Sequence, residues 1–379
     1  MRIPIRQTVA RSIERDYIQS QLLKPGQRLP SVRELEKKYG VSDTTILQAL
    51  NILEEQSVIY KIQGSGSYVS DARVLKDRQR LIGLVGPHNA SELFLLTHKG
   101  VDEVARRHGC QVVMADSESH YLCERECVKR LIEAGCVAII LNPLVRIREH
   151  SEVDYLRNEF LDVPIVLVDT AYPYQRRVQV IFDNYRAGYD MTRFLVGEGH
   201  RRIAFMDLET KQTELAHRSV QERFRGYCDA LQGLGIEYRS EYRYVVYVLP
   251  DSDADRVQDE NHIPTEEQIE LLLKNWLKAK DRPTALIALE DYVAMSTMGI
   301  AHELGVSVPD DLQIAGFDNR RSGLYKPNFP TTNPDFQRAG QLAAELAFQR
   351  LDGLIEEPFV FVLPVPLKYR RDPGKAKKI

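Results

Sequence analysis

The stretch RLPSVRELEKKYGVSDTTILQALNILEEQSVIYKIQGSGSYV, residues 28–69, carries two helical patterns followed by an alternating strand pattern. Ser31 followed three positions later by Glu34 is the sequence of a capping box, in which the two residues satisfy free backbone amides at a helix start reciprocally. Gly40 then supplies the left-handed backbone at which a helix ends. We therefore expect a short helix between Ser31 and Gly40.

A second helix is predicted directly after this turn. Ser42 can cap it, and Ile46, Leu50 and Leu53 recur at helical spacing, so that these three side chains can face a core. Two short helices joined by a tight turn that contains glycine form a helix-turn-helix, whose second helix lies in the DNA major groove. The polar residues left on the outer side of the second helix are Ser42, Thr44, Thr45 and Gln48.

The pattern changes from helical to alternating after residue 57. Val58, Tyr60 and Ile62 alternate along the chain, and the sequence Gly-Ser-Gly at 64–66 supplies a turn before the second strand. A hairpin in this position predicts a wing beside the reading helix.

Residues 4–69 resemble the winged-helix domain of GntR-family transcription regulators, through LKPGQRLPSVRELEKKYGVS, a TT pair and QALNILEEQSVIYKIQGSGSYV in that order. The resemblance implies binding of double-stranded operator DNA through the RELE segment, the start of the second helix and the wing tip. With the outward Gln48 added, the candidate positions are Arg33, Ser42, Thr44, Thr45, Gln48, Gln63 and Gly64. The family usually has Arg where this chain has Asp43, and often where it has Leu47, so two donors to guanine or phosphate are missing. A protein-binding winged helix, with hydroxyl residues serving only as caps, is the alternative.

The composition is that of an ordinary soluble protein with two or three domains: 379 residues, 43% hydrophobic and 28% charged. The net charge is −3, but residues 1–80 hold 14 Lys and Arg against 9 Asp and Glu, a local +5, which leaves −8 for the remainder. The N-terminal end is therefore the part that attracts phosphate. The chain starts without the apolar core of a secretion signal and has no run long enough to cross a bilayer, so we expect a cytoplasmic protein.

Five cysteines are scattered through core-like segments. Cys123 and Cys127 lie four apart on a predicted helix, but no further Cys or His stands at zinc-ligand spacing. Buried, reduced thiols are expected, and neither a metal nor another cofactor is predicted. The chain also lacks a glycine-rich phosphate loop and a nucleophile elbow, which argues against an enzyme.

From residue 81 onward, apolar runs of five or six residues alternate with helical stretches. The runs LIGLVG, QVVMA, VAIIL, PIVLV and VQVIF suit strands buried on both faces of a parallel sheet, and the helices between them supply the crossovers. The same alternation resumes at residue 185, so we expect two doubly wound sheets.

The predicted fold class is therefore α/β, with an N-terminal winged helix-turn-helix and a two-lobed doubly wound sensor domain. The winged helix is expected at 1–70, a linker at 71–80 and the sensor domain at 81–371. The first lobe is expected to comprise 81–184 with 319–352, and the second 185–318 with 353–371.

Residues 81–369 resemble the effector-binding part of LacI-family regulators, similar in fold to type I periplasmic sugar-binding proteins. Eight motifs carry this resemblance: IGLVGP, VDEVARRHGCQVVMADS, VPIVLVD, FDNYRAGYDMTRFLVGEGHRRIAFM, ERFRGYCDAL, RPTALIALEDYVAM, LGVSVPDDLQIAGFDN and FPTTNPDFQRAG. It implies that the chain crosses between two lobes three times, and that a small molecule binds between them at the carboxyl ends of the strands.

Four positions match cleft contacts of that family: Phe94, Asp183, Arg223 and Asp291. Carboxylates at strand ends can accept hydroxyl hydrogen bonds, a guanidinium gives paired donation, and an aromatic ring can stack on a sugar or a base. Structural roles are the alternatives: helix N-caps for Asp183 and Asp291, a surface ion pair for Arg223 and a core position for Phe94. Further candidates at strand or helix ends are Asn142, Asp169, Ser219 and Asp318.

These features predict a cytoplasmic, homodimeric transcription regulator, most simply a repressor, with a small-molecule effector that changes its operator affinity. The mixed architecture is similar to that of arabinose-responsive regulators, so a pentose or another sugar is the expected effector. A nucleobase or nucleoside is the alternative ligand. A sugar-modifying enzyme with a DNA-binding head is the alternative class.

Overall fold

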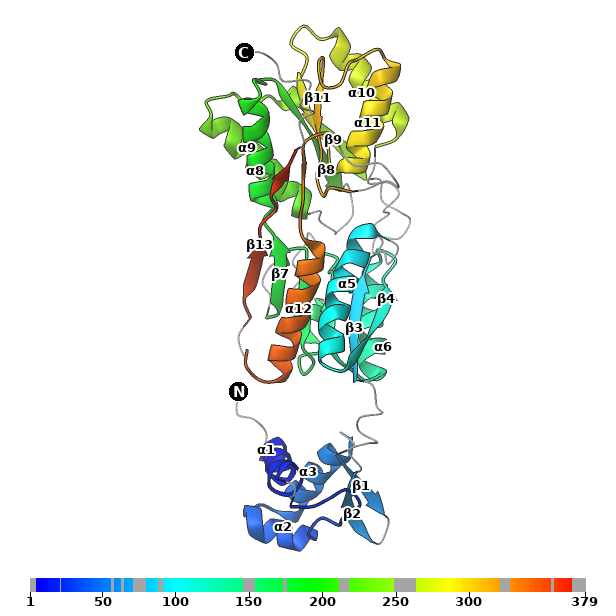
Figure 1. Ribbon diagram of the computed structural model, residues 1–379, viewed down its shortest axis with the longest axis vertical. Coiled ribbons are helices and arrows are strands. Elements are labelled where there is room, and N and C mark those ends of the chain that lie inside the picture. The colour runs from blue at the N-terminus through cyan, green and yellow to red at the C-terminus, as the bar shows by residue number, and fades with distance from the viewer. Residues whose placement is uncertain are drawn as a thin grey trace. The chain divides into compact units, whose positions relative to one another are not determined.

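The computed structural model (Figure 1) describes residues 5–20, 22–55, 58–62, 65–70, 80–87, 91–145, 154–172, 176–210, 218–248, 264–320, 328–355 and 358–369. It divides into two compact units, Met1–Gln79 and Arg80–Ile379. The division falls at the end of the predicted linker, whose residues 71–79 lie outside the described part.

The N-terminal unit begins as a helix-turn-helix. Its helices are α1 (Ile5–Ile13, continued by the π-helical turn Glu14–Gln19), α2 (Val32–Tyr39) and α3 (Asp43–Glu55). The predicted capping box of Ser31 and Glu34 is present, and Gly40 ends α2 with a φ of 64°. Leu35 of α2 and Ile46 of α3 are fully buried in the core that these helices share with α1. The predicted helix pair is confirmed.

A two-stranded hairpin follows the helices. Strand β1 (Ile59–Ile62) pairs antiparallel with β2 (Gly66–Val69), and the Tyr60 and Tyr68 rings stack with centroids 5.6 Å apart. Leu29 N donates to Ser67 O at 2.8 Å, which ties the segment before α2 to the hairpin. The predicted wing is therefore part of the same small core.

The first lobe of the second unit is a six-stranded parallel sheet in the order β13-β7-β6-β5-β3-β4. The strands are β3 (Arg80–Gly86), β4 (Cys110–Asp116), β5 (Cys136–Leu141), β6 (Ile165–Asp169), β7 (Val178–Phe182) and β13 (Val360–Leu363). Along β5, Ala138 and Ile140 join the core under α5 (Glu92–Arg107) and α12 (Phe336–Leu351), whereas Ile139 and Leu141 join the core under α6 (Tyr121–Glu133) and α7 (Tyr155–Asn158). Because helices cover both faces, the strands read as continuous apolar runs.

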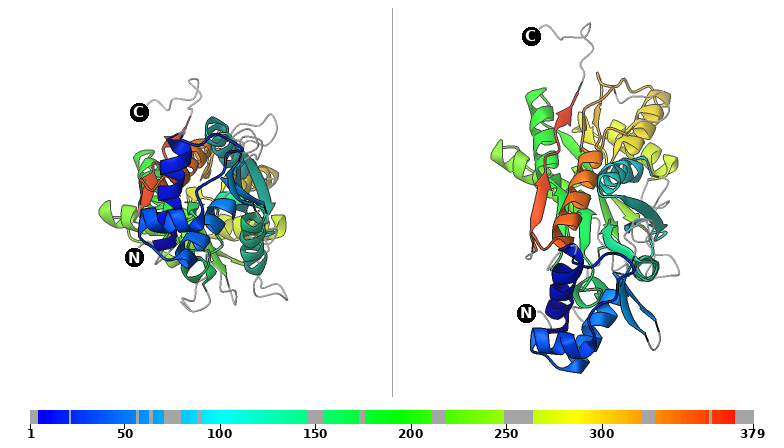
Figure 2. Two further views of the ribbon diagram at one scale, coloured as in Figure 1. Left: turned by 90° about the horizontal axis from the view of Figure 1, so that it is seen from below. Right: turned by 60° about the horizontal axis from the view of Figure 1, so that its bottom comes forward.

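The second lobe is a four-stranded parallel sheet in the order β11-β10-β8-β9. Its strands are β8 (Ile203–Thr210), β9 (Arg243–Val248), β10 (Ala285–Ile287) and β11 (Gln313–Ala315). Its helices are α8 (Asn184–Gly197), α9 (Arg218–Gly233), α10 (Glu266–Lys278) and α11 (Asp291–Glu303). Two views turned from the first (Figure 2) show α8 and α9 side by side, as their many contacts require. The structure therefore confirms the prediction of two doubly wound sheets.

The lobe boundaries differ from the prediction at the C-terminal end. Strand β13, expected in the second lobe, pairs parallel with β7 and forms an edge of the first-lobe sheet. Strand β12 (Thr331–Thr332), expected in the first lobe, pairs with β14 (Leu367–Lys368), and both contact α8 of the second lobe. Sequence periodicity identifies a strand but carries no information about its non-local partner, so these two assignments were wrong.

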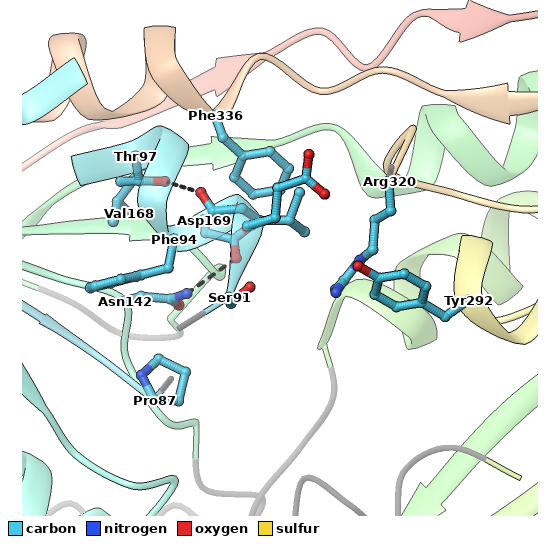
Figure 3. A pocket seen from close by; sticks show the side chains of 12 residues that line it. Pro87, Ser91, Phe94, Thr97, Asn142, Val168, Asp169, Tyr292, Arg320 and Phe336 are labelled. Carbon is cyan, nitrogen blue, oxygen red and sulfur yellow. Dashed lines mark hydrogen bonds between the residues drawn. The ribbon is translucent and has the colours of Figure 1, made fainter. Parts of the chain in front are cut away.

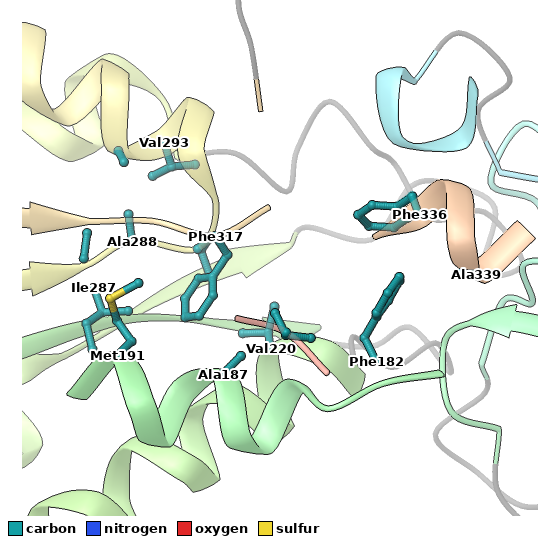
Figure 4. Close-up of a cluster of buried hydrophobic side chains, with 14 of the residues drawn as sticks. Phe182, Ala187, Met191, Val220, Ile287, Ala288, Val293, Phe317, Phe336 and Ala339 are labelled. Carbon is teal, nitrogen blue, oxygen red and sulfur yellow. The ribbon is translucent and has the colours of Figure 1, made fainter. Parts of the chain in front are cut away.

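Aromatic packing marks the point where the chain crosses between lobes. The rings of Phe182, at the end of β7, and Phe336, at the start of α12, meet edge to face with centroids 4.8 Å apart. Figure 4 shows them beside the second-lobe core, in which Met191, Ile287 and Phe317 lie together. The two lobes are therefore joined through apolar contacts as well as through the chain that crosses between them.

All five cysteines are free. Cys110, Cys127 and Cys136 are buried and burial raises their thiol pKa values, whereas Cys123 is exposed, contrary to the expectation of a buried thiol. Among the described residues, no group of three or more His, Cys, Asp and Glu side chains is arranged to hold a metal ion.

Glycines allow α8 and α9 of the second lobe to approach each other closely. A Cβ at Gly188 of α8 would lie 2.0 Å from the Arg223 carbonyl oxygen of α9, and one at Gly226 of α9 would lie 2.1 Å from the Tyr185 carbonyl oxygen. Atoms of the backbone cannot turn aside as a flexible side chain can. The contact between α8 and α9 therefore requires glycine on both helices.

Gly188→Ala is expected to destabilise the second unit by about 3 kcal/mol, the upper end of the usual effect of overpacking. Gly299→Ala is the matched control, since Gly299 lies in α11 with nothing within 4 Å of its added Cβ, and it should stabilise by roughly 0.5–1 kcal/mol. Fluorescence of Trp276, the single tryptophan and part of α10, reports the unfolding of this unit in the full chain. Equal shifts for the two variants would contradict the close-packing argument.

Candidate functional site

The outward side of α3 presents the side chains predicted to touch DNA. Ser42, Thr44 and Gln48 are exposed, and Thr45 is half-buried. Ser42 Oγ lies 3.0 Å from Thr45 Oγ1 and accepts from Thr45 N at 3.4 Å, while Asp43 Oδ1 accepts from Thr44 N at 2.6 Å. These contacts cap the start of α3. A hydroxyl has one donor and two acceptor positions, so capping leaves it able to bind DNA as well.

The other predicted DNA contacts lie on α2 and at the wing. Arg33 is exposed in the first turn of α2, and Gln63 and Gly64 lie outside the described residues. The sequence of α3 contains neither Lys nor Arg, and Lys61 of β1 is paired with Glu54 at 2.6 Å. The side chains that α3 can offer to a base edge without Lys or Arg are therefore chiefly hydroxyl, amide and apolar.

A cavity of about 540 Å³ opens between the two lobes of the second unit (Figure 3), a volume typical of small-molecule sites. The first-lobe wall comes from the start of α5 and the carboxyl ends of β5 and β6, and the second-lobe wall from residues that follow β10 and β11. The rings of Phe94 and Phe336 supply aromatic surface. The polar side chains that the lobes contribute include Ser91, Thr97, Asn142, Asp169, Tyr292 and Arg320.

Asp169 is the acceptor at the first-lobe wall. It ends β6 with a φ of 74°, and Asn142 Nδ2 donates to its Oδ2 at 3.3 Å. Burial, reinforced by the Asp318 carboxylate, raises the pKa of Asp169 to about 6, although Arg223 acts in the opposite direction. The carboxylate is therefore ionised at pH 7 and can accept hydrogen bonds from a ligand.

Arg320 is the donor at the second-lobe wall. Its Nη2 lies 2.8 Å from Glu290 Oε2, and its guanidinium carbon lies 5.1 Å from the centroid of the Tyr292 ring. Its Nε is buried and has no hydrogen-bond partner in the described part of the chain. The side chain lines the cavity, where a guanidinium can donate to an oxygen of a ligand.

The sequence-predicted effector residues divide into three groups. Phe94, Asn142 and Asp169 line the cavity. Arg223 and Asp318 form a buried ion pair at 2.9 Å, and Arg223 also donates to Asn184 Oδ1 and Leu289 O. The remaining three, which do not line the cavity, are Asp183, Asp291 and Ser219.

Those three residues have other positions in the fold. Asp183 is the N-cap of α8 and accepts from Arg186 N at 2.8 Å. Asp291 is fully buried, accepts from Thr331 Oγ1 at 2.7 Å, and has a pKa raised to about 8 by burial. Ser219 lies in the first turn of α9. Asp183 therefore occupies the helix N-cap position that was the structural alternative to binding an effector.

Nine residues that line the cavity were absent from the sequence prediction: Pro87, Ser91, Glu92, Leu93, Thr97, Val168, Tyr292, Arg320 and Phe336. Tyr292 and Arg320 each stand one or two positions beyond a predicted candidate, Asp291 and Asp318. The signal in the sequence was therefore the strand end itself: Val168 and Tyr292 directly adjoin the candidates Asp169 and Asp291, and Arg320 lies two positions after Asp318.

A helix-turn-helix with an outward reading helix, joined to a two-lobed α/β unit with an inter-lobe cavity, defines a transcription regulator with a small-molecule sensor. Residues 5–69 match the model of bacterial regulatory proteins of the gntR family, and residues 192–371 match that of a periplasmic binding protein-like domain. The chain therefore carries a GntR-family helix-turn-helix domain followed by a periplasmic-binding-protein-like domain.

Individual proteins resemble the chain over most of its length. An arabinose metabolism transcriptional repressor of Geobacillus stearothermophilus is 27% identical over 80% of this chain and 79% of its own. The transcriptional repressor PurR of Mannheimia succiniciproducens is 25% identical over 85% of this chain and 92% of its own. The fold is shared with a periplasmic binding protein/LacI transcriptional regulator of Alkaliphilus metalliredigens, whose structure was solved with D-xylulofuranose. The TM-score is 0.58, and the identity is 19% over 77% of this chain and 98% of that chain.

The chain is thus a ligand-responsive, DNA-binding transcription regulator. The two curated relatives are named as transcriptional repressors, which agrees with the prediction that the chain is not an enzyme. Among the residues that the structure describes, no helix is long and apolar enough to span a membrane.

Proposed function

We propose that this protein is a homodimeric, cytoplasmic repressor whose operator affinity is changed by a sugar bound between the two lobes. The observation that carries the proposal is the cavity, which takes Asp169 from one lobe and Arg320 from the other. The names of the arabinose repressor and of the D-xylulofuranose complex among similar proteins support a sugar, and a pentose first.

The side chains of the cavity match the chemistry of a hydroxylated ring. The Asp169 carboxylate accepts from hydroxyl groups, while the Asn142 amide and the Arg320 guanidinium donate to hydroxyl or ring oxygens. Phe94 and Phe336 offer apolar surface to the C–H face of the ring. The same two rings could also stack on a base, so a nucleobase or nucleoside is the second candidate.

Linkage explains how such a ligand would act on DNA. Polar groups on both walls contact a ligand together only when the lobes are correctly spaced, so the ligand favours that spacing over others. The size of this shift is set by the difference between the affinities of the ligand for the two lobe spacings. Because coupling between two sites is reciprocal, the ligand then changes the affinity of the two helix-turn-helix domains of a dimer for a near-palindromic operator.

A melting screen of the full chain with pentoses, hexoses, nucleobases and nucleosides tests the effector class. At a hundredfold excess over its Kd, a ligand stabilises the native state by about 2.7 kcal/mol, and the midpoint of the Trp276 fluorescence transition should rise by several degrees. A sugar is expected to give the largest rise and to be recovered chemically unchanged. A rise with nucleosides alone would contradict the sugar assignment, and turnover of the ligand would contradict simple binding.

A further inference from the structure

The reading helix α3 has an unusual outer surface for a helix that binds DNA. Its residues Asp43–Glu55 include no Lys or Arg, and Leu47 is 47% exposed, whereas the neighbouring Ile46 and Leu50 are 0% and 2% exposed. An exposed leucine is common by itself. Its position in the middle of the helix that enters the groove is what requires an explanation.

Leu47 belongs to a single stripe along α3. Thr44, Leu47, Gln48 and Asn51 are spaced by three and four residues, so they lie on one side of the helix, and all four are exposed. Asn51 Oδ1 accepts a hydrogen bond from Lys61 of the wing. Asn51 is therefore partly engaged by the protein, and Leu47 and Gln48 are at the centre of the stripe.

The charged side chains beside this stripe are engaged within the protein. Asp43, at the N-terminal end of the stripe, accepts a hydrogen bond from Thr44 N. Lys61, which contacts the stripe at Asn51, is also paired with Glu54 at 2.6 Å. Guanine is read best by the paired donors of Arg or Lys, which α3 does not possess. The helix therefore lacks the side chains that read guanine best.

The chemistry of Leu47 and Gln48 suits A·T pairs instead. In the major groove, thymine alone presents a methyl group, which attracts apolar side chains, and adenine presents an acceptor and a donor that match the amide of Gln. One isolated leucine among polar neighbours is too small for a protein-binding patch, but it is the right size to cover a methyl group.

We propose that Leu47 contacts the C5-methyl group of a thymine and that Gln48 binds a neighbouring adenine, so that each half-site presents A·T pairs to the middle of α3. This inference deepens the proposed function, because it rests on operator binding by the helix-turn-helix. It names the bases that the operator must contain where α3 enters it.

The first experiment selects binding sites for the purified full chain from a random duplex library, which requires no assumption about the operator sequence. Enriched sites should carry A·T pairs at the α3 position. Replacing the thymine there with deoxyuridine, which lacks only the methyl group, should weaken binding by wild-type protein about threefold to fivefold. Leu47→Ala should bind the thymine site more weakly by a similar factor and should no longer distinguish thymine from deoxyuridine.

Two variants provide controls. Leu22→Ala removes another exposed leucine of the same unit, 64% exposed and outside α3, and should keep the full preference for thymine. Leu47→Arg should shift the selected base at this position toward guanine. Unchanged helical circular dichroism and melting of the N-terminal unit, followed in the full chain, establish that each variant is folded.

The outcomes separate this inference from the function on which it rests. Selected sites with G·C pairs at the α3 position, or a thymine preference that persists in Leu47→Ala, would overturn the role of Leu47 and leave the regulator function standing. A library in which no sequence is enriched, with or without the sugars tested, would overturn both.

Discussion

Asp169→Asn is expected to lower the affinity for the effector by about tenfold to a hundredfold, while operator binding by the unliganded protein stays unchanged. Hydrogen bonds to a charged group contribute ~1.5–3 kcal/mol, which corresponds to that range. Asn has the same shape, keeps an oxygen for the Asn142 amide, and tolerates the φ of 74° at this position. Calorimetric titration with the ligand found in the melting screen measures the loss.

Asp183→Asn is the matched control for this variant. Asp183 is also a carboxylate where the chain passes between the lobes, but its side chain caps α8 and does not line the cavity. Asn is an equally good N-cap, so the variant should fold and bind the effector as wild type does. A similar loss of affinity in both variants would contradict the assignment of Asp169 as the particular acceptor.

The pKa of Asp169 predicts the pH dependence of the site. With a pKa of about 6, the carboxylate loses its charge as the pH falls through 6, and effector affinity should fall with it. The stability of the free protein moves the other way. A carboxyl whose folded pKa lies above its unfolded value of 3.8 adds stability that is complete below pH 3.8 and is lost as the pH rises through about 6.

Asp291 complicates the stability measurement, because burial raises its pKa to about 8, so its own loss of stability begins in the same pH range and continues to about pH 8. The difference between wild type and Asp169→Asn, measured from pH 5 to pH 8, isolates the contribution of Asp169. Affinity that depends on pH equally in both proteins would show that another group titrates in the binding equilibrium.

Local sequence patterns predicted the elements of this fold because their causes are local. The capping box of Ser31 and Glu34 and the left-handed Gly40 depend on residues within one or two turns, and the apolar runs of the sensor domain follow from burial on both faces of a sheet. Strand partners are set by contacts between distant segments. The run at β13 could be recognised as a strand, but its pairing with β7 could not.

The same distinction applies to the site. Asn142 and Asp169 were predictable because they end adjacent parallel strands, whose carboxyl ends meet at the cavity. Arg223 was predicted as a ligand contact on its chemistry, but an internal partner 95 residues away, Asp318, occupies its guanidinium in this structure. A sequence pattern identifies a donor without revealing whether a ligand or the protein itself provides the acceptor.

Arg223→Met is accordingly expected to destabilise the second unit by about 3–5 kcal/mol, the usual effect of removing one member of a buried ion pair. Arg223 is 8% exposed and donates to three acceptors, the Asn184 side chain, Leu289 O and Asp318 Oδ1, at 2.9–3.1 Å. Methionine fills a similar volume and leaves all three acceptors without their donor. The midpoint of the Trp276 transition in the full chain should fall accordingly.

A double variant decides whether this loss comes from the stranded charge. In Arg223→Met/Asp318→Asn the carboxylate is also removed, and Asn tolerates the φ of 85° at that position, so a substantial part of the stability should return. If Arg223 instead acted mainly as a ligand contact, Arg223→Met alone would keep wild-type stability and lose only effector affinity. Stability that is unchanged in the single variant would therefore contradict the structural role assigned to this pair and return Arg223 to the binding site.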